Sequence, residues 1–257
     1  MHIYSVWRNL LDELHSFLLH DHLFTLCTWK AYFFPKLPVY YLNKYETRIG
    51  NITVNNYRYR IRKLKDHQQY HDPSHRAKEL GISAATWSLF GVVWPSGHVL
   101  ANTVSVLNLE GKRILEIGCG IALASIVLHK MGFNVTASDN HPLVKEFLDQ
   151  NILNNKLPPI KYETGDWNIE NPLLGKFDFI IGSDILYQPS HAKLVSAFID
   201  AHSSERVEVI IVDPNRSNRS KFIAKMDALG YSHNYEPFIY TTDYGVLIRG
   251  RILYFHR

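Results

Sequence analysis

The stretch RILEIGCGIA, residues 113–122, decides how this chain folds. It begins with an almost uninterrupted apolar run, which is typical of a strand buried on both faces in a parallel sheet. Gly118 and Gly120 follow that run at once, and residues 122–131 then predict a helix. Glycines at a strand-to-helix turn let a ligand approach the backbone, and a helix N-terminus favours negative groups. The stretch therefore predicts a βα unit with a ligand at its turn.

The remainder of the chain after residue 112 repeats this alternation of strands and helices. Further strands are predicted at 134–139, 160–167, 177–184 and 207–214, and further helices at 143–154, 191–202 and 217–229. Apolar strands separated by helices indicate a parallel sheet covered on both faces. Residues 231–240 and 246–255 have no helix between them and predict an antiparallel hairpin at the sheet edge. We expect an α/β fold: a doubly wound, mostly parallel, seven-stranded Rossmann-like sheet with an antiparallel C-terminal hairpin and an N-terminal extension.

The composition indicates a globular protein with one substantial core, because 46% of the 257 residues are hydrophobic and 20% are charged. Lysine and arginine number 28 against 24 aspartates and glutamates, so the net charge is +4. The chain has no long basic tract, and we expect no nucleic-acid partner.

The cysteine content and the N-terminus bear on the compartment. Cys27 and Cys119 are too few for a disulfide framework, and residues 1–8 lack the features of a secretory signal, so we expect a cytoplasmic protein. The longest apolar-looking stretch, residues 18–41, contains charges, histidines and two prolines. We therefore expect no transmembrane segment.

The N-terminal part differs in pattern from the rest. Apolar residues between positions 3 and 18 recur at helical spacing, and residues 29–45 are rich in aromatic side chains around two prolines. We predict a helical and aromatic extension that either caps the core or docks a partner or a membrane surface. The extension is placed at 1–48 and the main domain at 49–257. Within that domain, residues 49–100 form a lead-in with a hairpin across Asn55-Asn56, and residues 101–257 form the core.

Three histidines in the lead-in, His67, His71 and His75, lie four residues apart, which on one helix would place them on a common face. Pro73 interrupts that run, and neither an HExxH motif nor a cysteine pair accompanies it. We expect no metal site.

Acidic residues follow three of the predicted strands, where open α/β sheets bind ligands. Glu116 lies two residues before the first glycine and suits a ligand with a positive amino group. Asp139 ends the second strand, 21 residues beyond Gly118, the offset at which a carboxylate accepts ribose hydroxyls. Asp166 and Trp167 end the third strand, where a carboxylate can accept from an adenine amino group and an indole can cover the ring. Together these residues predict a nucleoside site.

The glycine turn has simpler interpretations that stay open. Leu123 stands where the GxGxxG dinucleotide fingerprint requires a small residue, so the turn supports NAD only weakly. Cys119 lies in the turn with no base nearby in the sequence, and we interpret it as a small residue tolerated in a tight turn rather than as a nucleophile. Taken singly, a glycine pair can be a plain turn and an aspartate a helix cap.

At this point the chain resembles the seven-β-strand S-adenosylmethionine-dependent methyltransferases, and within them the methyltransferase 16 family of protein lysine methyltransferases. The resemblance covers about residues 50–257 and is carried by Gly91–Gly97 (GVVWPSG), Glu116–Gly120 (EIGCG), Asp139, Asp166-Trp167, Ser183–Tyr187 (SDILY) and Asp213–Arg216 (DPNR). It implies S-adenosylmethionine as the cofactor and a lysine side chain of a protein as the substrate. The cofactor-binding residues it implies are Trp94, Glu116, Gly118, Cys119, Gly120, Asp139, Asp166, Trp167 and Ser183.

The catalytic residues that the resemblance implies are Asp184 and Tyr187, in the D-x-x-Y segment. A lysine amine has a pKa of about 10.4, so its neutral form at pH 7 costs about 4.6 kcal/mol. The Tyr187 ring would form one side of the acceptor site, and its hydroxyl would accept an N–H of the amine. Asp184 would capture and orient the amine. Proximity and alignment would then drive in-line methyl transfer without a metal or a covalent intermediate. An isolated aspartate of this kind often only caps a helix, and an isolated tyrosine often only packs in the core.

The sequence therefore predicts an S-adenosylmethionine-dependent N-methyltransferase that acts on protein lysine. Transfer to histidine or to a small amine, and a non-catalytic S-adenosylmethionine-binding module, are the alternatives; an NAD-dependent oxidoreductase is disfavoured. Arg216 and Arg219, at the start of the last helix, are expected to be solvated. The substrate's identity, the number of methyl groups added, the role of residues 1–48 and the oligomeric state are left open.

Overall fold

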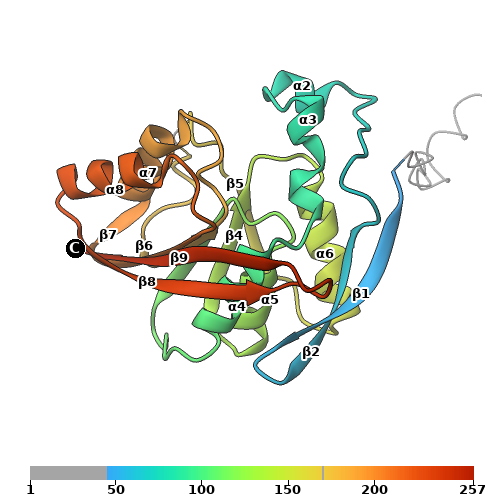
Figure 1. Ribbon diagram of the computed structural model, residues 1–257, viewed down its shortest axis with the longest axis horizontal. Coiled ribbons are helices and arrows are strands. Elements are labelled where there is room, and N and C mark those ends of the chain that lie inside the picture. Colours follow the sequence, from blue (N-terminus) through green and yellow to red (C-terminus); the bar gives the residue numbers. More distant parts are fainter. Residues whose placement is uncertain (1–44, 170) are drawn as a thin grey trace, which may run out of the picture. The chain divides into compact units, whose positions relative to one another are not determined.

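A mixed sheet of seven strands organises the chain in the computed structural model, which describes residues 45–169 and 171–257 (Figure 1). The strands are β3 (Arg113–Ile117), β4 (Asn134–Asp139), β5 (Lys161–Thr164), β6 (Phe177–Ser183), β7 (Ser203–Asp213), β8 (Ser232–Thr241) and β9 (Leu247–His256). Their order across the sheet is β5-β4-β3-β6-β7-β9-β8. The first five run parallel, and β9 is antiparallel to both β7 and β8. The predicted fold class is confirmed.

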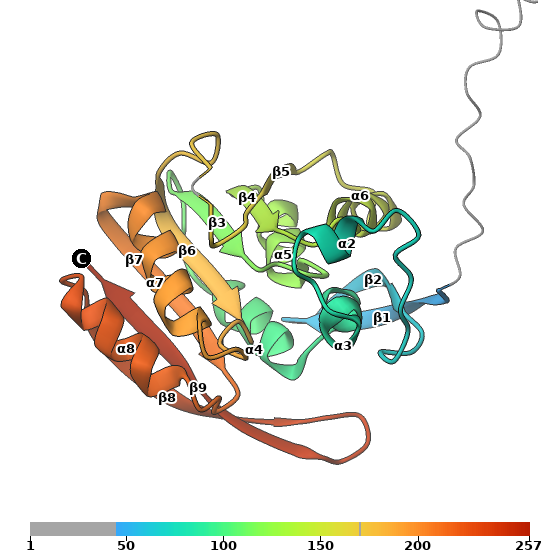
Figure 2. The ribbon, with the colours of Figure 1, turned by 90° about the horizontal axis from the view of Figure 1, so that it is seen from above.

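Helices cover both faces of this sheet. Figure 2 shows α4 (Pro95–Val104), α5 (Leu123–Lys130) and α6 (Val144–Asn154) on one face, and α7 (His191–His202) and α8 (Arg219–Ala228) on the other. Successive strand residues point to opposite faces, so a buried strand supplies two separate cores. In β3, Ile114 packs into the core on the α5 side, whereas Leu115 packs into the core on the α7 side. This division explains why the parallel strands read as continuous apolar runs.

A hairpin of β1 (Thr47–Val54) and β2 (Tyr57–Leu64) precedes the sheet, as predicted. Asn55 and Asn56 join the two strands with φ values of 45° and 66°. A two-residue turn with both residues at positive φ matches the twist of the flanking strands, and asparagine tolerates that conformation. Between the hairpin and α4 lie the short helices α2 (Arg76–Glu79), α3 (Ala84–Trp87) and η2 (Ser88–Gly91).

Two asparagines, one in α6 and one at its C-cap, attach the hairpin to the rest of the fold. Asn151 accepts from the Arg62 N–H at 2.6 Å and donates to the Arg62 carbonyl at 3.2 Å. One helical turn later, Asn155 makes the same pair of bonds with Arg60, at 2.9 Å each. The two side-chain amides thus pair with the outer edge of β2 as a neighbouring strand would, which satisfies backbone groups beside the core.

Two strands differ from their predicted bounds by three residues or more, the other elements after residue 112 by at most two, and some predictions fall outside the described residues. Strand β5 stops at Thr164 instead of 167, because the chain turns away after Gly165, whose N–H still donates to the Asp139 carbonyl at 3.1 Å. Strand β7 starts at Ser203, directly after α7, rather than at 207. The predicted helix at 3–18 and most of the aromatic segment lie outside the described residues, and the boundary of the extension stays a prediction. In the part of the chain that the structure describes, no helix has the length and apolarity to cross a bilayer.

Candidate active site

A cleft of about 890 Å³ lies at the carboxyl ends of the central parallel strands. In the sheet, β4 lies on one side of β3 and β6 lies on its other side, so the strand order reverses at β3. Open α/β sheets bind ligands at such a switch point. The structure brings every site residue predicted from the sequence to the lining of this one cleft: Trp94, Glu116, Gly118, Cys119, Gly120, Asp139, Asp166, Trp167, Ser183, Asp184 and Tyr187. The individual roles assigned to them stay predictions.

The turn after β3 requires its glycines. Gly118 and Gly120 have φ values of +56° and +50°, and the next alternate residue, Ala122, has +58°. A Cβ on Gly120 would lie 2.9 Å from the carbonyl oxygen of Phe90, and a Cβ on Gly118 would lie 2.9 Å from Ile185. A side chain at either position would therefore meet fixed neighbours as well as backbone strain. Small residues here let a ligand approach the backbone at the floor of the cleft.

Glu116 lies beneath this turn and is 4% exposed. Its Oε2 accepts the backbone N–H of Ser125, in the first turn of α5, at 2.8 Å. Burial raises the pKa of the Glu116 carboxyl to about 7, although the bonds from Ser125 oppose that shift. A buried carboxylate without a basic partner among the described side chains is ready to take a cationic group from a ligand.

Asp139, at the end of β4, ties two loops together. Its Oδ2 accepts the Gly120 N–H and its Oδ1 accepts the His141 N–H, both at 2.9 Å. Burial raises the pKa of this carboxyl, and the backbone N–H groups oppose the rise. Each oxygen still has a lone pair, so the predicted bonds to ribose hydroxyls are compatible with this geometry. The position of Asp139 also makes it a structural support for the glycine turn.

The placement of Asp166 and Trp167 corrects the sequence prediction. They do not end a strand; they lie in the turn after β5, where Asp166 Oδ1 accepts from the backbone N–H and the side-chain amide of Asn168 at 2.8 and 2.9 Å. The Trp167 ring nevertheless covers Gly118, since a Cβ there would lie 3.0 Å from the indole. An aspartate side chain that accepts N–H groups of its own turn stabilises that turn against a continued strand. This explains why the predicted strand at 160–167 was too long at its end.

Trp94 closes the cleft from the lead-in. It is the N-cap residue of α4, and its indole N–H donates to the Leu89 carbonyl at 3.0 Å. This bond holds the ring against the short 3-10 helix while one side lines the cleft. The polar tip is satisfied, so the ring can offer an apolar wall.

Ser183, Asp184 and Tyr187 form the opposite end of the cleft, at the carboxyl end of β6. Asp184 has φ +56°, and its N–H donates to the Val212 carbonyl at 2.9 Å. A non-glycine residue held at positive φ is often found at functional sites, where the surrounding structure enforces the strain. The Tyr187 side chain is 40% exposed, and burial of its hydroxyl together with Asp139 and Asp184 raises its pKa to about 12.

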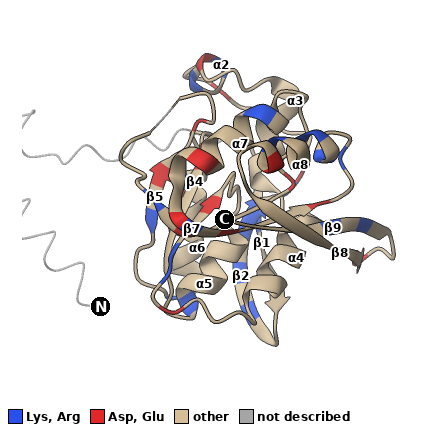
Figure 3. Cartoon of the chain, turned by 90° about the vertical axis from the view of Figure 1, so that its left-hand side faces the viewer, with Lys and Arg blue, Asp and Glu red and all other residues tan. Residues whose placement is uncertain are grey.

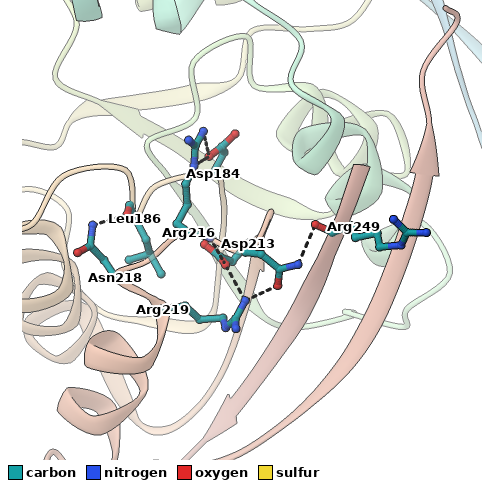
Figure 4. A network of polar contacts seen from close by, with 8 residues as sticks. Asp184, Leu186, Asp213, Arg216, Asn218, Arg219 and Arg249 are labelled. Atoms are coloured by element: carbon teal, nitrogen blue, oxygen red, sulfur yellow. Dashed lines mark hydrogen bonds and ion pairs between the residues drawn. The ribbon is translucent and has the colours of Figure 1, made fainter. Parts of the chain in front are cut away.

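The two arginines expected to be solvated both pair with carboxylates; the Arg216 side chain is 40% exposed, and that of Arg219 is 16% exposed. Arg216 bonds to Asp184, with both Nε and Nη2 at 2.8 Å from Oδ1, and Arg219 Nη1 lies 3.4 Å from Oδ2 of the fully buried Asp213 (Figure 4). The sequence shows them only as basic residues on a loop, whereas their carboxylate partners come from β6 and the end of β7. The Arg216–Asp184 pair depends on the register of two parallel strands, and the Arg219–Asp213 pair depends on the path of the turn after β7.

Two histidines at the cleft were missed. His141 stacks on Phe90 with ring centroids 3.9 Å apart, and its Nδ1 accepts the Leu143 N–H, so Nε2 carries the proton in the neutral ring. Burial lowers its pKa to about 3, and Nε2 has no partner among the described residues. His191, the first residue of α7, lies edge-on to both Trp167 and Tyr187. Nothing in the local sequence distinguishes these from surface histidines.

Charged side chains outside the cleft are mixed in sign over the described part of the chain (Figure 3). Basic and acidic positions are interspersed over the face drawn in Figure 3, in keeping with the net charge of +4. Within residues 45–169 and 171–257, no group of three histidine, cysteine, aspartate or glutamate side chains is placed to hold a metal ion. His75 lies at the N-cap of the four-residue α2 with φ +56°, so the three spaced histidines do not share a helix.

The chain belongs to the lysine methyltransferase family, whose model matches residues 76–229, more than half of the chain. The expected family is thereby confirmed. Among relatives, the protein N-lysine methyltransferase METTL21A of Danio rerio is 34% identical over 118 residues, which is 43% of this chain and 50% of the relative. The histidine protein methyltransferase 1 homolog of Dictyostelium discoideum is 37% identical over 101 residues, 37% of this chain and 33% of the relative. The chain spans about half the length of the curated relatives that it matches first.

The solved structures show the fold alone. A Streptococcus mutans protein provisionally assigned as an S-adenosylmethionine-dependent methyltransferase aligns with a TM-score of 0.56 at 15% identity, over 81% of this chain and 55% of the other. That likeness confirms the doubly wound sheet with its antiparallel hairpin.

Proposed function

We propose that this chain is an S-adenosylmethionine-dependent N-methyltransferase that modifies a lysine side chain of a protein. One observation carries the proposal: a single cleft joins a glycine turn flanked by Glu116 and Asp139 to the Asp184 and Tyr187 pair. Membership of the lysine methyltransferase family supports the same acceptor. A nucleoside site and an amine-binding site in one cavity are what methyl transfer between two bound molecules requires.

The described residues fit S-adenosylmethionine as the cofactor. Gly120 lets a ligand reach the backbone where a Cβ would clash, Glu116 is a buried carboxylate suited to the amino group, and Asp139 keeps lone pairs for ribose hydroxyls. The buried Nε2–H of His141 has no partner among the described residues. When bound, this cofactor supplies an activated methyl group on a sulfonium. The chain's residues would hold it through the amino group, the ribose and the adenine.

Asp184 and Tyr187 act on the acceptor. The hydroxyl of Tyr187 stays protonated at neutral pH, because its pKa is raised to about 12, and its oxygen can accept an N–H from an amine. Asp184 accepts a second N–H and so fixes the direction of the nitrogen lone pair. The partly exposed Tyr187 ring leaves the acceptor end open to a side chain that enters from another protein.

Methyl transfer to histidine is the second candidate, because one relative is named a histidine protein methyltransferase homolog. An imidazole is neutral near pH 7, so it needs no carboxylate to bind it. A neutral imidazole offers a single N–H, whereas an amine offers two to the oxygens of Asp184 and Tyr187, so this pair favours an amine as the incoming group. A module that binds the cofactor without transfer is the third outcome.

The test uses the full chain, tritiated S-adenosylmethionine and a cell lysate. Acid hydrolysis of the labelled protein followed by amino-acid chromatography should place the label in methylated lysine. Label in methylhistidine would replace the lysine proposal, and tight cofactor binding without any transfer would favour the binding module.

Asp184→Ala should reduce transfer at least about a hundredfold, since it removes the group that orients the acceptor, while calorimetry still detects the cofactor. Asp149→Ala is the matched control, because Asp149 is an exposed aspartate of α6 paired with Lys145. Full activity of Asp184→Ala would show that the acceptor binds elsewhere.

A reducing compartment, the cytoplasm, is part of this proposal. Cys119 is a buried free thiol that lines the cleft, and burial raises its pKa well above the ordinary value. A cysteine that remains free suits a reducing environment, where disulfides are rare. Fractionation of cells that express the tagged chain should recover it with cytosolic markers.

A further inference from the structure

We propose that Arg216 is a positioning residue for the acceptor: it holds Asp184 by one carboxylate oxygen and cancels its charge, so that the amine can enter in its neutral form. This inference rests on the proposed function. It resolves a conflict in the acceptor site, because a carboxylate that orients an amine also stabilises the unreactive ammonium form.

The geometry leaves one oxygen of Asp184 available. Both Nε and Nη2 of Arg216 converge on Oδ1 at 2.8 Å (Figure 4). Oδ2 has no hydrogen-bond partner among residues 45–169 and 171–257. The Asp184 side chain is 7% exposed and that of Arg216 is 40% exposed, so the guanidinium reaches the carboxylate from the rim of the cleft. One free acceptor oxygen suits an amine N–H, whereas a guanidinium substrate would need both oxygens for a paired bond.

The turn after β7 fixes the direction of Arg216. Its backbone N–H donates to Asp213 Oδ2 at 3.0 Å. Asn215, at φ +63°, donates its side-chain amide to the Arg249 carbonyl on β9 at 3.1 Å. Arg219 Nη1 lies 3.4 Å from the same Oδ2 of Asp213. The turn is thus fastened to the ends of two strands before the Arg216 side chain extends toward β6.

The charges around Asp184 come from several elements, and their balance depends on Arg216. Burial raises the pKa of the Asp184 carboxyl, and Arg216 opposes that rise. From the neighbouring elements, Asp213 and Arg219 of the β7–α8 turn compensate one another, and Tyr187 stays neutral. Buried His191 on α7 donates Nδ1–H to the Ile185 carbonyl at 2.7 Å, and burial lowers its pKa.

On the β4 side, Asp139 adds negative charge and receives only backbone N–H groups. Among the described residues, Arg216 is therefore the cation that contacts Asp184. Without it, an ammonium entering beside the carboxylate would keep its proton. With it, that proton is released to solvent and the amine binds through Oδ2.

The kinetic test compares Arg216→Gln and Arg216→Lys with the matched control Arg113→Gln, using tritiated S-adenosylmethionine and the lysate protein that wild type labels on lysine. Transfer is measured from pH 6 to pH 10. Arg216→Gln should move the acid limb of kcat upward by about one pH unit or more, which lowers transfer at pH 7 about tenfold and restores it at high pH. Arg216→Lys should keep most of the wild-type limb, because the charge is retained.

Arg113→Gln should leave the limb in place, since Arg113 is the first residue of β3, pairs with Asp178 and does not line the cleft. A uniform loss of rate at every pH in Arg216→Gln would assign Arg216 a purely structural role and overturn the proposal.

A second measurement does not depend on transfer. Carboxyl ¹³C NMR of the chain saturated with S-adenosylhomocysteine, with Asp184→Asn to assign the resonance, should show Asp184 titrating at higher pH in Arg216→Gln than in wild type. An unchanged Asp184 titration beside an active wild-type enzyme would overturn the role of Arg216 alone. If instead the Asp184 titration shifts in Arg216→Gln but the wild-type chain transfers no methyl group, the proposed function is overturned and the pairing of Arg216 with Asp184 stands.

Discussion

The two ends of the cleft hold their carboxylates in different ways. Glu116 and Asp139, at the tips of β3 and β4, are bonded by backbone N–H groups of the loops beside them. Asp184 and Asp213, at the tips of β6 and β7, are paired with Arg216 and Arg219. All four are largely buried, so the contrast lies in what compensates their charge.

This contrast matches two kinds of ligand. A carboxylate held by neutral N–H groups keeps its attraction for a cation or a hydroxyl, which suits a cofactor that is positive at its amino group. A carboxylate neutralised by arginine can still accept a hydrogen bond without stabilising an extra positive charge. The cofactor end is therefore built to attract charge, and the acceptor end is built to orient a neutral amine.

The largest effect should come from Asp139→Ala at the cofactor end. The change removes the acceptor of the Gly120 and His141 N–H groups together with the predicted ribose contact. Hydrogen bonds to charged groups contribute about 1.5–3 kcal/mol each, so affinity for S-adenosylhomocysteine should fall about a hundredfold or more by calorimetry. Asp149→Ala should leave affinity unchanged. Unchanged affinity in Asp139→Ala would remove the contrast between the two ends.

Asp213→Asn should produce the next largest effect, on stability rather than on binding. Asp213 is fully buried beside Arg219, and losing its charge leaves that guanidinium unpaired. We expect urea denaturation to show a loss of about 2 kcal/mol in the free energy of unfolding. Asp227→Asn on α8, which breaks an exposed contact with His233, should cost less than about 0.5 kcal/mol. Equal effects would mean that the buried pair contributes no more than a surface contact.

A smaller effect, on the pH dependence of ligand affinity, is expected from Glu116 at the cofactor end. Because burial raises its pKa to about 7, the ligand-free carboxyl is protonated below that pH and must lose a proton before it can take an ammonium. Affinity for S-adenosylhomocysteine should therefore rise about tenfold from pH 6 to pH 8, with proton release on binding. Glu116→Gln should flatten this dependence. A dependence that survives in the variant would assign the proton to another group.

Much of the cofactor end could be predicted because its signals are local in sequence. The glycine turn, Glu116 and Asp139 follow directly from two predicted strands, and the carboxyl ends of neighbouring parallel strands must lie together. The hairpin turn at Asn55-Asn56 could be predicted for the same reason, since few other residues accept positive φ at two successive positions. The prediction of 160–167 as a strand was wrong at its end because Asp166 makes a local turn that competes with strand pairing.

The sequence by itself determined the order of strands and helices, the doubly wound sheet and the family, because apolar periodicity, glycine turns and short motifs act over a few residues. Only the tertiary structure decided that Arg216 bonds Asp184, that Arg219 bonds Asp213 and that His141 and His191 line the cleft. The partners in the arginine pairs are separated by 32 and 6 positions, and the contacts arise from strand register and the path of one turn. Pairwise charge contacts depend on distances in space, which local sequence patterns do not specify.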